Sequence, residues 1–232
     1  AASDVYKRQA SEFVKTDLKQ RWGISDAKIE VLPMPTPDPL EVIDDKATEN
    51  KHTIICIANF WPHKNQSTLI QAANILVGLF PQLSLTFVGD GPTRPECEQL
   101  AKSLGLQDNL HFLGNVSQID LERILGQTNV VCVPTEFEAA SFPVIEGMKF
   151  GKSVIASSIA PFEEIRDSGI SIYGEPKDHE ALARAIRKTF EAPKLTEKQT
   201  RARVNYLASI STDVIGRRLI EIYKSVISLS AK

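Results

Sequence analysis

The chain has 232 residues, enough for one large domain or two modest ones, and its 42% hydrophobic content is typical of a globular protein. Its formal net charge of -2 provides no field that would attract nucleic acid or an acidic membrane surface. No apolar stretch approaches the roughly 20 residues that a membrane-spanning helix requires. We therefore expect no nucleic-acid partner and no transmembrane segment. The composition does not exclude small neutral or anionic ligands.

The N-terminal part predicts a helix, a strand and then a linker. In SEFVKTDLKQRWG, Ser11 is placed to cap the helix. The apolar stripe of this helix, which needs a partner surface, consists of Phe13, Val14, Leu18 and Trp22. KIEVLP predicts the strand, and the polar, proline-rich stretch PMPTPDPLEVIDDKATENKH fits a linker between lobes.

From residue 53 onward, six β-branched runs alternate with segments of helical period. The runs that predict strands are TIICIA, LSLTFVG, NLHFLG, VVCVP, SVIAS and ISIYG. Helices are predicted within residues 64–80, 93–104, 117–127, 143–150, 161–168 and 178–191. This alternation predicts an α/β fold, with a doubly wound parallel six-stranded Rossmann-like sheet covered by helices on both faces. Ligands bind such sheets beyond the carboxyl ends of the strands.

The C-terminal part predicts two further helices. The apolar side of the last one consists of Ile215, Leu219, Ile222, Tyr223 and Val226. We therefore divide the chain into residues 1–46, 47–192 and 193–232.

The three cysteines predict no metal site. Cys56, Cys97 and Cys132 lack CxxC spacing, and the first and last lie inside apolar runs. They are typical of reduced core thiols, which indicates a cytoplasmic protein. No His, Cys and Asp cluster has the spacing of metal ligands either.

The segment EAASFPVIEG, residues 138–147, follows a predicted strand and carries two carboxylates. Its proline favours a helix that begins around Ser141 to Pro143, whose free amides could bind a phosphate. Glu146, expected in the first turn, could accept two hydrogen bonds from ribose hydroxyls, and Glu138 could do so for another sugar. Either glutamate alone could equally be a solvated or helix-dipole residue, but their joint spacing favours a ligand site.

The loop NFWPHKN follows the first predicted strand of the sheet. Lys64 is expected to open the next helix, where a cation opposes the helix dipole by about 0.3–1 kcal/mol. A diphosphate would remove this mismatch, although a lone lysine is more often a solvated surface residue.

The turn VGDGP has two glycines of a dinucleotide-binding pattern. Arg94 stands where that pattern requires a third glycine, so we expect no NAD binding. We interpret Gly89 and Gly91 as the residues that permit a tight strand-to-helix turn.

Residues 53–190 resemble the C-terminal, donor-binding lobe of retaining nucleotide-sugar glycosyltransferases of family 4, which have the GT-B fold. The resemblance is carried by the long run from VGDGPTRPECEQL through PTEFEAASFPVIEGMKFGKSVIAS to APFEEI. The segment SEFVKTDLKQRWGISDAKIEVLP resembles, more weakly, the final helix and strand of that family's N-terminal lobe. The resemblance implies that residues 1–46 are a remnant of the acceptor lobe with the interdomain linker, and that 193–232 pack back toward this lobe. We expect most of this N-terminal acceptor lobe to be absent from the chain.

The resemblance also implies roles for the two glutamates and the lysine. Glu138 and Glu146 match a pair in which the first contacts the transferred sugar and the second holds the ribose. Lys64 matches a lysine that contacts the donor diphosphate, so Lys64 and Glu138 are the expected catalytic residues. An arginine usually joins this lysine, but here that position is Asn59, which removes one charge that would stabilise the leaving group.

Two backbone segments complete the expected donor site. Ser141, Phe142 and Pro143 lie where amides meet phosphate, in a loop that has Ala139 and Ala140 in place of the family's glycine-rich sequence. Gly114, Asn115 and Val116 lie where the family reads the nucleobase.

The resemblance thus implies a glycosyltransferase of polysaccharide biosynthesis that uses a UDP-, GDP- or ADP-sugar, retains anomeric configuration and needs no metal or other cofactor. Its acceptor would be a carbohydrate or a lipid-linked carbohydrate bound through the missing lobe, so the chain alone should bind donor and transfer poorly. The full-length enzyme could be peripheral at the inner membrane face. Two alternatives stay open: a non-catalytic nucleotide-sugar-binding lobe, and a sugar-nucleotide epimerase of the same fold, which the PTEFEAASFPVIEG run disfavours.

Overall fold

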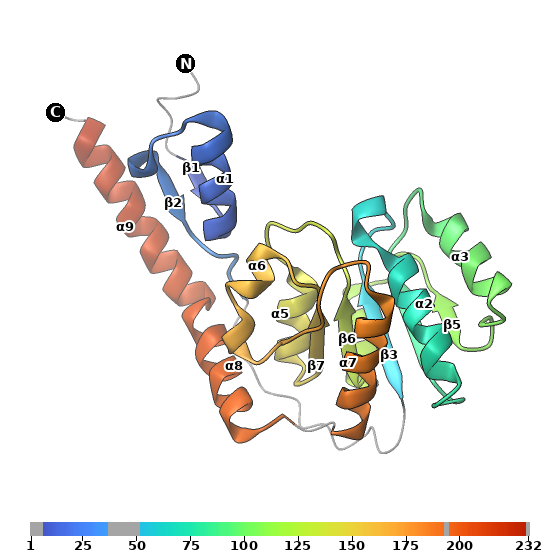
Figure 1. Ribbon diagram of the computed structural model, residues 1–232. Helices are drawn as coiled ribbons and strands as arrows, with labels where there is room; N and C mark the ends of the chain where they lie inside the picture. The colour runs from blue at the N-terminus through green and yellow to red at the C-terminus, as the bar shows by residue number, and fades with distance from the viewer. Residues whose placement is uncertain (1–6, 37–51, 193–194, 231–232) are drawn as a thin grey trace.

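The computed structural model describes residues 7–36, 52–192 and 195–230. Its main feature is a six-stranded parallel sheet with the strand order β5-β4-β3-β6-β7-β8 (Figure 1). The strands are β3 (Thr53–Ile57), β4 (Ser84–Val88), β5 (Leu110–Phe112), β6 (Val130–Val133), β7 (Ser153–Ala156) and β8 (Ser171–Ile172). All six strands were predicted, and the doubly wound fold is confirmed.

Alternate side chains of each strand enter two separate cores. Ile54 and Cys56 of β3 belong to a core with helices α2 (Gln66–Val77), α3 (Arg94–Ser103) and α7 (His179–Glu191). Ile55 belongs to the core on the opposite face, because successive strand residues point to opposite sides of a sheet. The helices that contribute to this second core are α4 (Gln118–Gly126), α5 (Phe142–Lys149), α6 (Ala160–Glu163) and α8 (Glu197–Ser209). The helix expected over 161–168 is divided into α6 and the 3-10 turn Arg166–Ser168.

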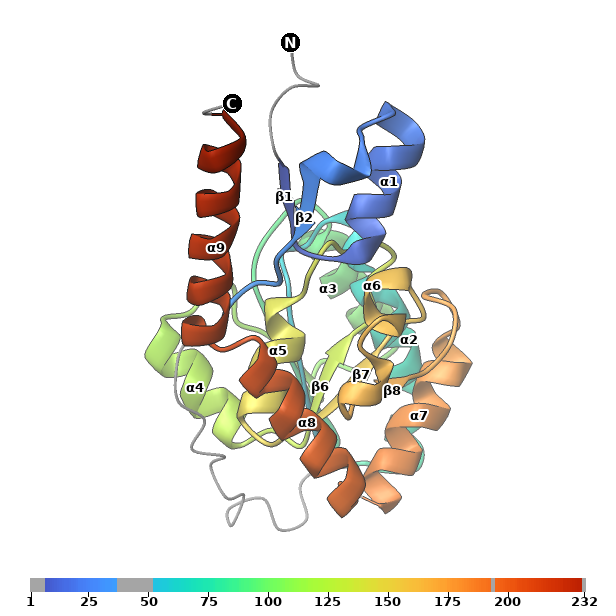
Figure 2. The ribbon, with the colours of Figure 1, turned by 90° about the vertical axis from the view of Figure 1, so that its left-hand side faces the viewer.

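The N-terminal segment is a small unit in which α1 (Glu12–Trp22) connects two parallel strands, β1 (Lys7–Gln9) and β2 (Ile29–Val31). The hydroxyl of Ser11 accepts a 3.4 Å hydrogen bond from the Val14 N–H, so the expected cap is confirmed. The expected apolar stripe is wrong at Trp22, which is 74% exposed. Indeed α1 has no buried residue, because only one side of this short helix meets other described parts of the chain (Figure 2).

The two C-terminal helices follow the sheet. The N–H of Thr36 donates to the Ile210 carbonyl at 2.9 Å, and the N–H of Thr212 returns a bond to the Thr36 carbonyl at 3.1 Å. From there α9 (Thr212–Ser230) runs alongside β1 and β2 (Figures 1 and 2). Ile215 is buried in the second core and Leu219 and Ile222 pack against it, whereas Tyr223 is 60% exposed, so the predicted stripe is wrong at Tyr223.

The boundaries proposed near residues 47 and 193 fall outside the described residues, and the division into lobes stays a prediction.

No helix within the described ranges combines the length and the apolarity needed to cross a bilayer.

Candidate functional site

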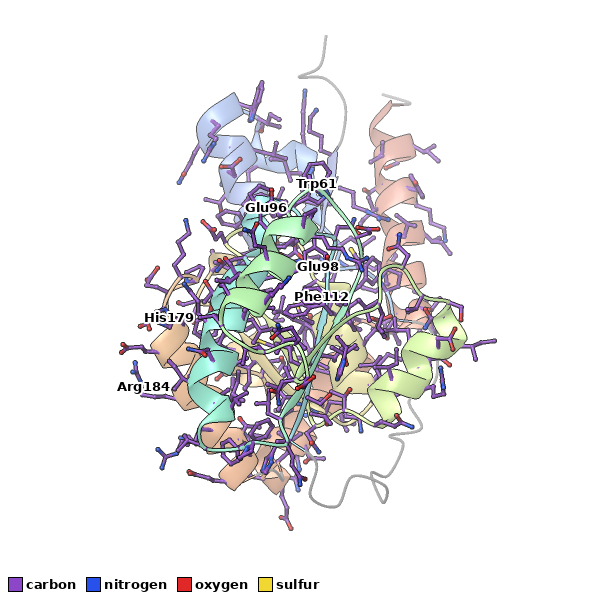
Figure 3. All side chains as sticks on the ribbon, turned by 90° about the vertical axis from the view of Figure 1, so that its right-hand side faces the viewer. Trp61, Glu96, Glu98, Phe112, His179 and Arg184 are labelled. Carbon is purple, nitrogen blue, oxygen red and sulfur yellow. The ribbon has the colours of Figure 1, made fainter. Side chains whose placement is uncertain are left out.

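The strand order reverses between β3 and β6, so the loops that leave these two strands diverge toward opposite ends of the sheet. This switch point is where an open α/β sheet forms its ligand crevice. The predicted segment 59–65 lies in the loop after β3, and the predicted segment 138–147 begins in the loop after β6, residues 134–141. Trp61, which is 50% exposed, lies at the end of the sheet that faces the N-terminal unit (Figure 3).

Backbone and side-chain hydrogen bonds fasten the two loops to each other. The carbonyl of His63 accepts from the Glu136 N–H at 2.7 Å and from the Thr135 hydroxyl at 2.9 Å. The amide of Asn65 donates to the Pro134 carbonyl at 3.0 Å. The loops therefore behave as one platform, and groups carried by them keep a fixed separation.

Asn65 is a site-forming residue that the sequence analysis missed. It has a left-handed backbone with φ of 57°, which is rare for a residue other than glycine, and its side chain is buried. Its amide also donates to the Pro176 carbonyl at 2.6 Å, from the loop after β8. An asparagine at the second position of the helix predicted within 64–80 was the available signal, because asparagine tolerates this conformation.

The position of Lys64 corrects one expectation. Lys64 does not open the helix but ends the 3-10 turn Pro62–Lys64, and α2 begins at Gln66. The left-handed conformation of Asn65 interrupts the helical path and places the lysine in the loop.

Lys64 and Glu138, predicted from segments 74 residues apart, lie together. The Lys64 Nζ is 2.8 Å from both Glu138 carboxylate oxygens, and the two side chains are 19% and 15% exposed. The lysine charge therefore has an anionic partner in the fold, on the platform at the switch point.

The helix after β6 begins as predicted. Ser141 is the N-cap of α5, Phe142 is its first residue and Pro143 its second. Phe142 is 59% exposed, whereas Ser141 is 7% exposed and its hydroxyl has no hydrogen-bond partner among the described residues. The amides of this first turn have no partner within the helix, which is the basis of the predicted anion site.

Glu146 lies in the second turn of α5, not in the first as expected, because the helix begins at Phe142. Burial raises the pKa of Glu146; Lys149 opposes this shift and Glu122 adds to it. No described contact joins Glu146 to Lys64 or Glu138. Its carboxylate accepts no hydrogen bond from the residues that the structure describes.

The other predicted donor-site residues lie at the same edge of the sheet. Asn59 is exposed, and its carbonyl accepts from the Gln66 amide at 3.1 Å. Gly114 has φ of 69°, and its carbonyl accepts from the Gly89 N–H at 2.8 Å. Next to it, Asn115 is exposed and Val116 is half-buried.

Gly89 and Gly91 form the tight turn that the sequence predicted. Both have positive φ, and a Cβ on Gly89 would lie 2.2 Å from the Ala58 carbonyl oxygen. A Cβ on Gly91 would lie 2.6 Å from the Phe60 carbonyl oxygen. Close approach of two backbone segments thus accounts for both glycines.

The described ranges contain no group of three or more His, Cys, Asp or Glu residues that could hold a metal ion. The three cysteines are free and buried, and burial raises the pKa of Cys56 to about 12. Such thiols are unreactive near neutral pH.

Sequence comparison matches residues 41–205 to the family described as "Glycosyl transferases group 1". An alpha-D-kanosaminyltransferase of Streptomyces kanamyceticus is 22% identical over 97% of this chain and 53% of its own length. A phosphatidyl-myo-inositol mannosyltransferase of Mycobacterium tuberculosis is 23% identical over 98% of this chain and 63% of its own length. The chain thus spans between about half and two thirds of these two relatives.

Solved structures give the same fold. A glycosyltransferase from Rickettsia africae superposes with a TM-score of 0.80 at 23% identity, over 96% of this chain and 64% of that one. HepE from Anabaena, crystallised with UDP-glucose, superposes with a TM-score of 0.79 at 19% identity, over 94% of this chain and 63% of that one.

Proposed function

Because this chain belongs to the glycosyl transferases group 1 family, we propose that its switch-point crevice binds the diphosphate of a nucleotide sugar for transfer of the sugar to an acceptor. The observation that carries this proposal is the pairing of Lys64 with Glu138 on the platform between β3 and α5. In this proposal the cation binds the diphosphate and the carboxylate beside it meets sugar hydroxyls.

Lys64 and the first-turn amides of α5 act on the leaving group. Cleavage of the bond between the anomeric carbon and the diphosphate passes through an oxocarbenium-like state while negative charge grows on the phosphate. Positioned donors stabilise such charge most when they are already oriented. In this mechanism Lys64 and the amides near Phe142 replace a metal, Glu138 contacts the transferred sugar, and configuration is retained as in family 4.

Glu146 and the loop after β5 hold the nucleoside. Glu146 has unused acceptor capacity, which fits the paired hydroxyls of ribose. The backbone of Gly114, Asn115 and Val116 reads the base. UDP is the first nucleotide to test because the Anabaena neighbour was crystallised with UDP-glucose, and GDP and ADP remain candidates.

In this proposal the acceptor binds mainly outside the residues of this chain. We propose a carbohydrate or lipid-linked carbohydrate acceptor of polysaccharide biosynthesis, bound mainly by an N-terminal lobe of which residues 1–46 are the end and toward which 193–232 pack. The whole enzyme would act in the cytoplasm, at the inner membrane face when its acceptor is lipid-linked. The chain alone is then a donor-binding part with little transfer activity.

A second candidate is a nucleotide-sugar-binding lobe without catalytic activity. Asn59 favours it, because an uncharged side chain stands where a second cation would stabilise the leaving diphosphate. Family membership disfavours the epimerase alternative.

Calorimetric titration of UDP-, GDP- and ADP-sugars into the chain tests the proposal. We expect one nucleotide class to bind, and Lys64→Ala and Glu146→Ala to weaken that binding at least tenfold, on the scale of one charge-assisted hydrogen bond. Lys177→Ala is the matched control, because Lys177 pairs with Glu136 on the same loop at 3.0 Å but is 73% exposed. Equal affinities for all four proteins would overturn the proposed site.

A further inference from the structure

Asn65 joins three of the loops at the carboxyl edge of the sheet. Its buried amide nitrogen donates to the Pro134 carbonyl, in the loop after β6, at 3.0 Å. The same nitrogen donates to the Pro176 carbonyl, in the loop after β8, at 2.6 Å. The Thr68 hydroxyl donates to the Asn65 Oδ1 at 2.8 Å, which orients the amide so that its nitrogen faces both carbonyls. One side chain, directly after Lys64, thus holds the loops of β3, β6 and β8 together.

Tyr173 supports the third of these loops. It is 9% exposed just after β8, and its hydroxyl donates to the Pro176 carbonyl at 2.6 Å. Burial raises the pKa of Tyr173, so its phenol stays protonated and remains a donor. The Pro176 carbonyl accepts from Tyr173 and from Asn65, which uses both of its lone pairs. The loop then leads into α7, which packs beside α2 in the first core (Figure 1). A hydrogen-bonded path therefore runs from the loop after β8 to the residue that follows Lys64.

The backbone conformation of Asn65 determines where Lys64 lies. With φ of 57° and ψ of 39°, Asn65 is in the left-handed region, which is unfavourable for residues other than glycine. Such conformations persist where the surrounding structure holds them, and they cluster at functional sites. Glycine would adopt this backbone more easily, but it has no amide to bind the other two loops. The asparagine therefore couples the position of Lys64 to loops that leave two other strands.

The Lys64 side chain benefits from such support, because a free lysine side chain carries about 2 kcal/mol of rotamer entropy. Its partner Glu138 stands on the loop after β6, which Asn65 holds through the Pro134 carbonyl. A displacement of about 1 Å in a catalytic group can lower a rate by two orders of magnitude. Hydrogen bonds that fix the three loops thus bear directly on the geometry that a diphosphate meets.

We propose that Asn65 and Tyr173 are positioning residues, which hold Lys64 in place for the diphosphate through hydrogen bonds that meet at the Pro176 carbonyl. This proposal rests on the proposed function, because Lys64 is the cation that binds the diphosphate there. Neither positioning residue contacts the donor. Removal of either should loosen Lys64 and leave the ribose contact of Glu146 intact.

Calorimetric titration of UDP into single and double variants tests the proposal. Asn65→Gly keeps the left-handed backbone and removes the amide, and Tyr173→Phe removes only the hydroxyl from a retained ring. We expect UDP affinity to fall about fivefold or more in each variant, on the scale of one hydrogen bond. Because both residues act through Lys64, this loss should disappear in the Lys64→Ala background and persist in the Glu146→Ala background.

Asn109→Gly is the matched control. The amide of Asn109 also donates to two backbone carbonyls, those of Pro81 at 3.2 Å and Leu83 at 2.8 Å, but at the opposite, amino edge of the sheet. This variant should lower the melting temperature without changing UDP affinity. If UDP affinity merely followed the melting temperature across Asn65→Gly, Tyr173→Phe and Asn109→Gly, the positioning role would be overturned.

The Nζ resonance of Lys64, observed by NMR on protein with isotope-labelled lysine, gives a measurement that needs no nucleotide. The resonance is assigned by its loss in Lys64→Ala. We expect Asn65→Gly and Tyr173→Phe to shift or broaden it, because the ion pair with Glu138 loosens, and Asn109→Gly to leave it unchanged.

The NMR measurement separates the positioning role from the proposed function. A changed Lys64 resonance in both variants would support the positioning role even if UDP did not bind or Lys64→Ala left its affinity unaltered, a result that would contradict the proposed donor site instead. An unchanged resonance would overturn the positioning role. So would a loss of UDP affinity that is the same with and without Lys64.

Discussion

Lys64 and Glu138 bind each other, with the lysine Nζ 2.8 Å from both carboxylate oxygens. An arriving diphosphate must therefore compete with Glu138 for the lysine. A partly exposed ion pair contributes about 0–1 kcal/mol, which is less than charge-assisted bonds to a phosphate supply. The pair can orient Lys64 in the free protein without preventing donor binding.

Glu138→Gln should raise the affinity for free UDP about fivefold, because it removes a competing anion worth about 1 kcal/mol. The same change should lower sugar transfer in the complete enzyme, since Glu138 is proposed to contact the sugar. Calorimetry with UDP measures the first effect. Glu136→Gln removes a charge from the neighbouring, more exposed ion pair and should change UDP affinity less. A loss of UDP affinity in Glu138→Gln would contradict competition for Lys64.

Nucleotide affinity should fall on acidification in a pH range above that of an ordinary glutamate. Burial raises the pKa of Glu146, and only its ionised form accepts two hydrogen bonds from ribose. As the pH falls through this raised pKa, the carboxylate is protonated and the ribose contact weakens. Titrations of UDP between pH 4.5 and 8 would show the inflection, and its persistence in Glu146→Gln would assign it to another group.

The raised pKa of Glu146 affects the stability of the fold in the opposite direction, because ionisation of Glu146 destabilises the folded protein. The folded protein disfavours ionised Glu146, so this residue lowers stability increasingly as the pH rises from the ordinary pKa to the raised one. Glu146→Gln should therefore unfold at a similar or higher temperature than the unmodified chain near neutral pH, even though it binds nucleotide less well.

Gly147→Ala should destabilise the fold by about 1–3 kcal/mol, because α5 is packed closely on the sheet. A Cβ on Gly147 would lie 2.8 Å from a methyl of Val154 and 2.9 Å from one of Val131. Gly126→Ala, at the end of α4 where a Cβ meets no atom within 4 Å, is the matched control and should be neutral or slightly stabilising. Urea denaturation measures the free energy of unfolding of both variants. Equal changes in the two would show that the close packing of α5 on the sheet does not penalise a Cβ at Gly147.

Asn59→Arg should strengthen UDP binding about tenfold if a second cation reaches the diphosphate. Asn59 is exposed in the loop after β3, so a longer side chain meets no buried wall. Ser103→Arg adds the same charge near the far end of α3 and should have little effect. If donor affinity, and transfer with a supplied N-terminal lobe, both stay flat in Asn59→Arg, the missing charge does not limit this protein.

Local patterns in the sequence were sufficient for the elements and for several site residues. Alternation of apolar strands with amphipathic helices predicted the sheet, because burial on both faces imposes that pattern directly on the chain. The proline at position 143 located the start of α5. The tight turn at Gly89 and Gly91 was also predicted, whereas the close approach of the Ala58 carbonyl to Gly89 was not.

Contacts between distant segments were decided only by the tertiary structure. Asn65 reaches carbonyls at Pro134 and Pro176, and its left-handed backbone moved Lys64 out of the helix. The structure also forms a cavity of about 400 Å³ that Ser141, Tyr206 and the N-terminal unit line, and local patterns do not bring these parts together. The exposure of Trp22 is likewise a property of the surfaces around α1 rather than of its periodicity.

The sequence by itself thus determined the order of strands and helices along the chain and the carboxyl-edge loops that carry charge, because both depend on residues a few positions apart. Only the folded chain decided that Lys64 is neutralised by Glu138, that Glu146 is half-buried one turn into its helix, and that Ser141 is buried. The physical reason is that hydrogen bonding and desolvation depend on which atoms surround a group, and packing brings those atoms from parts of the chain far apart in sequence.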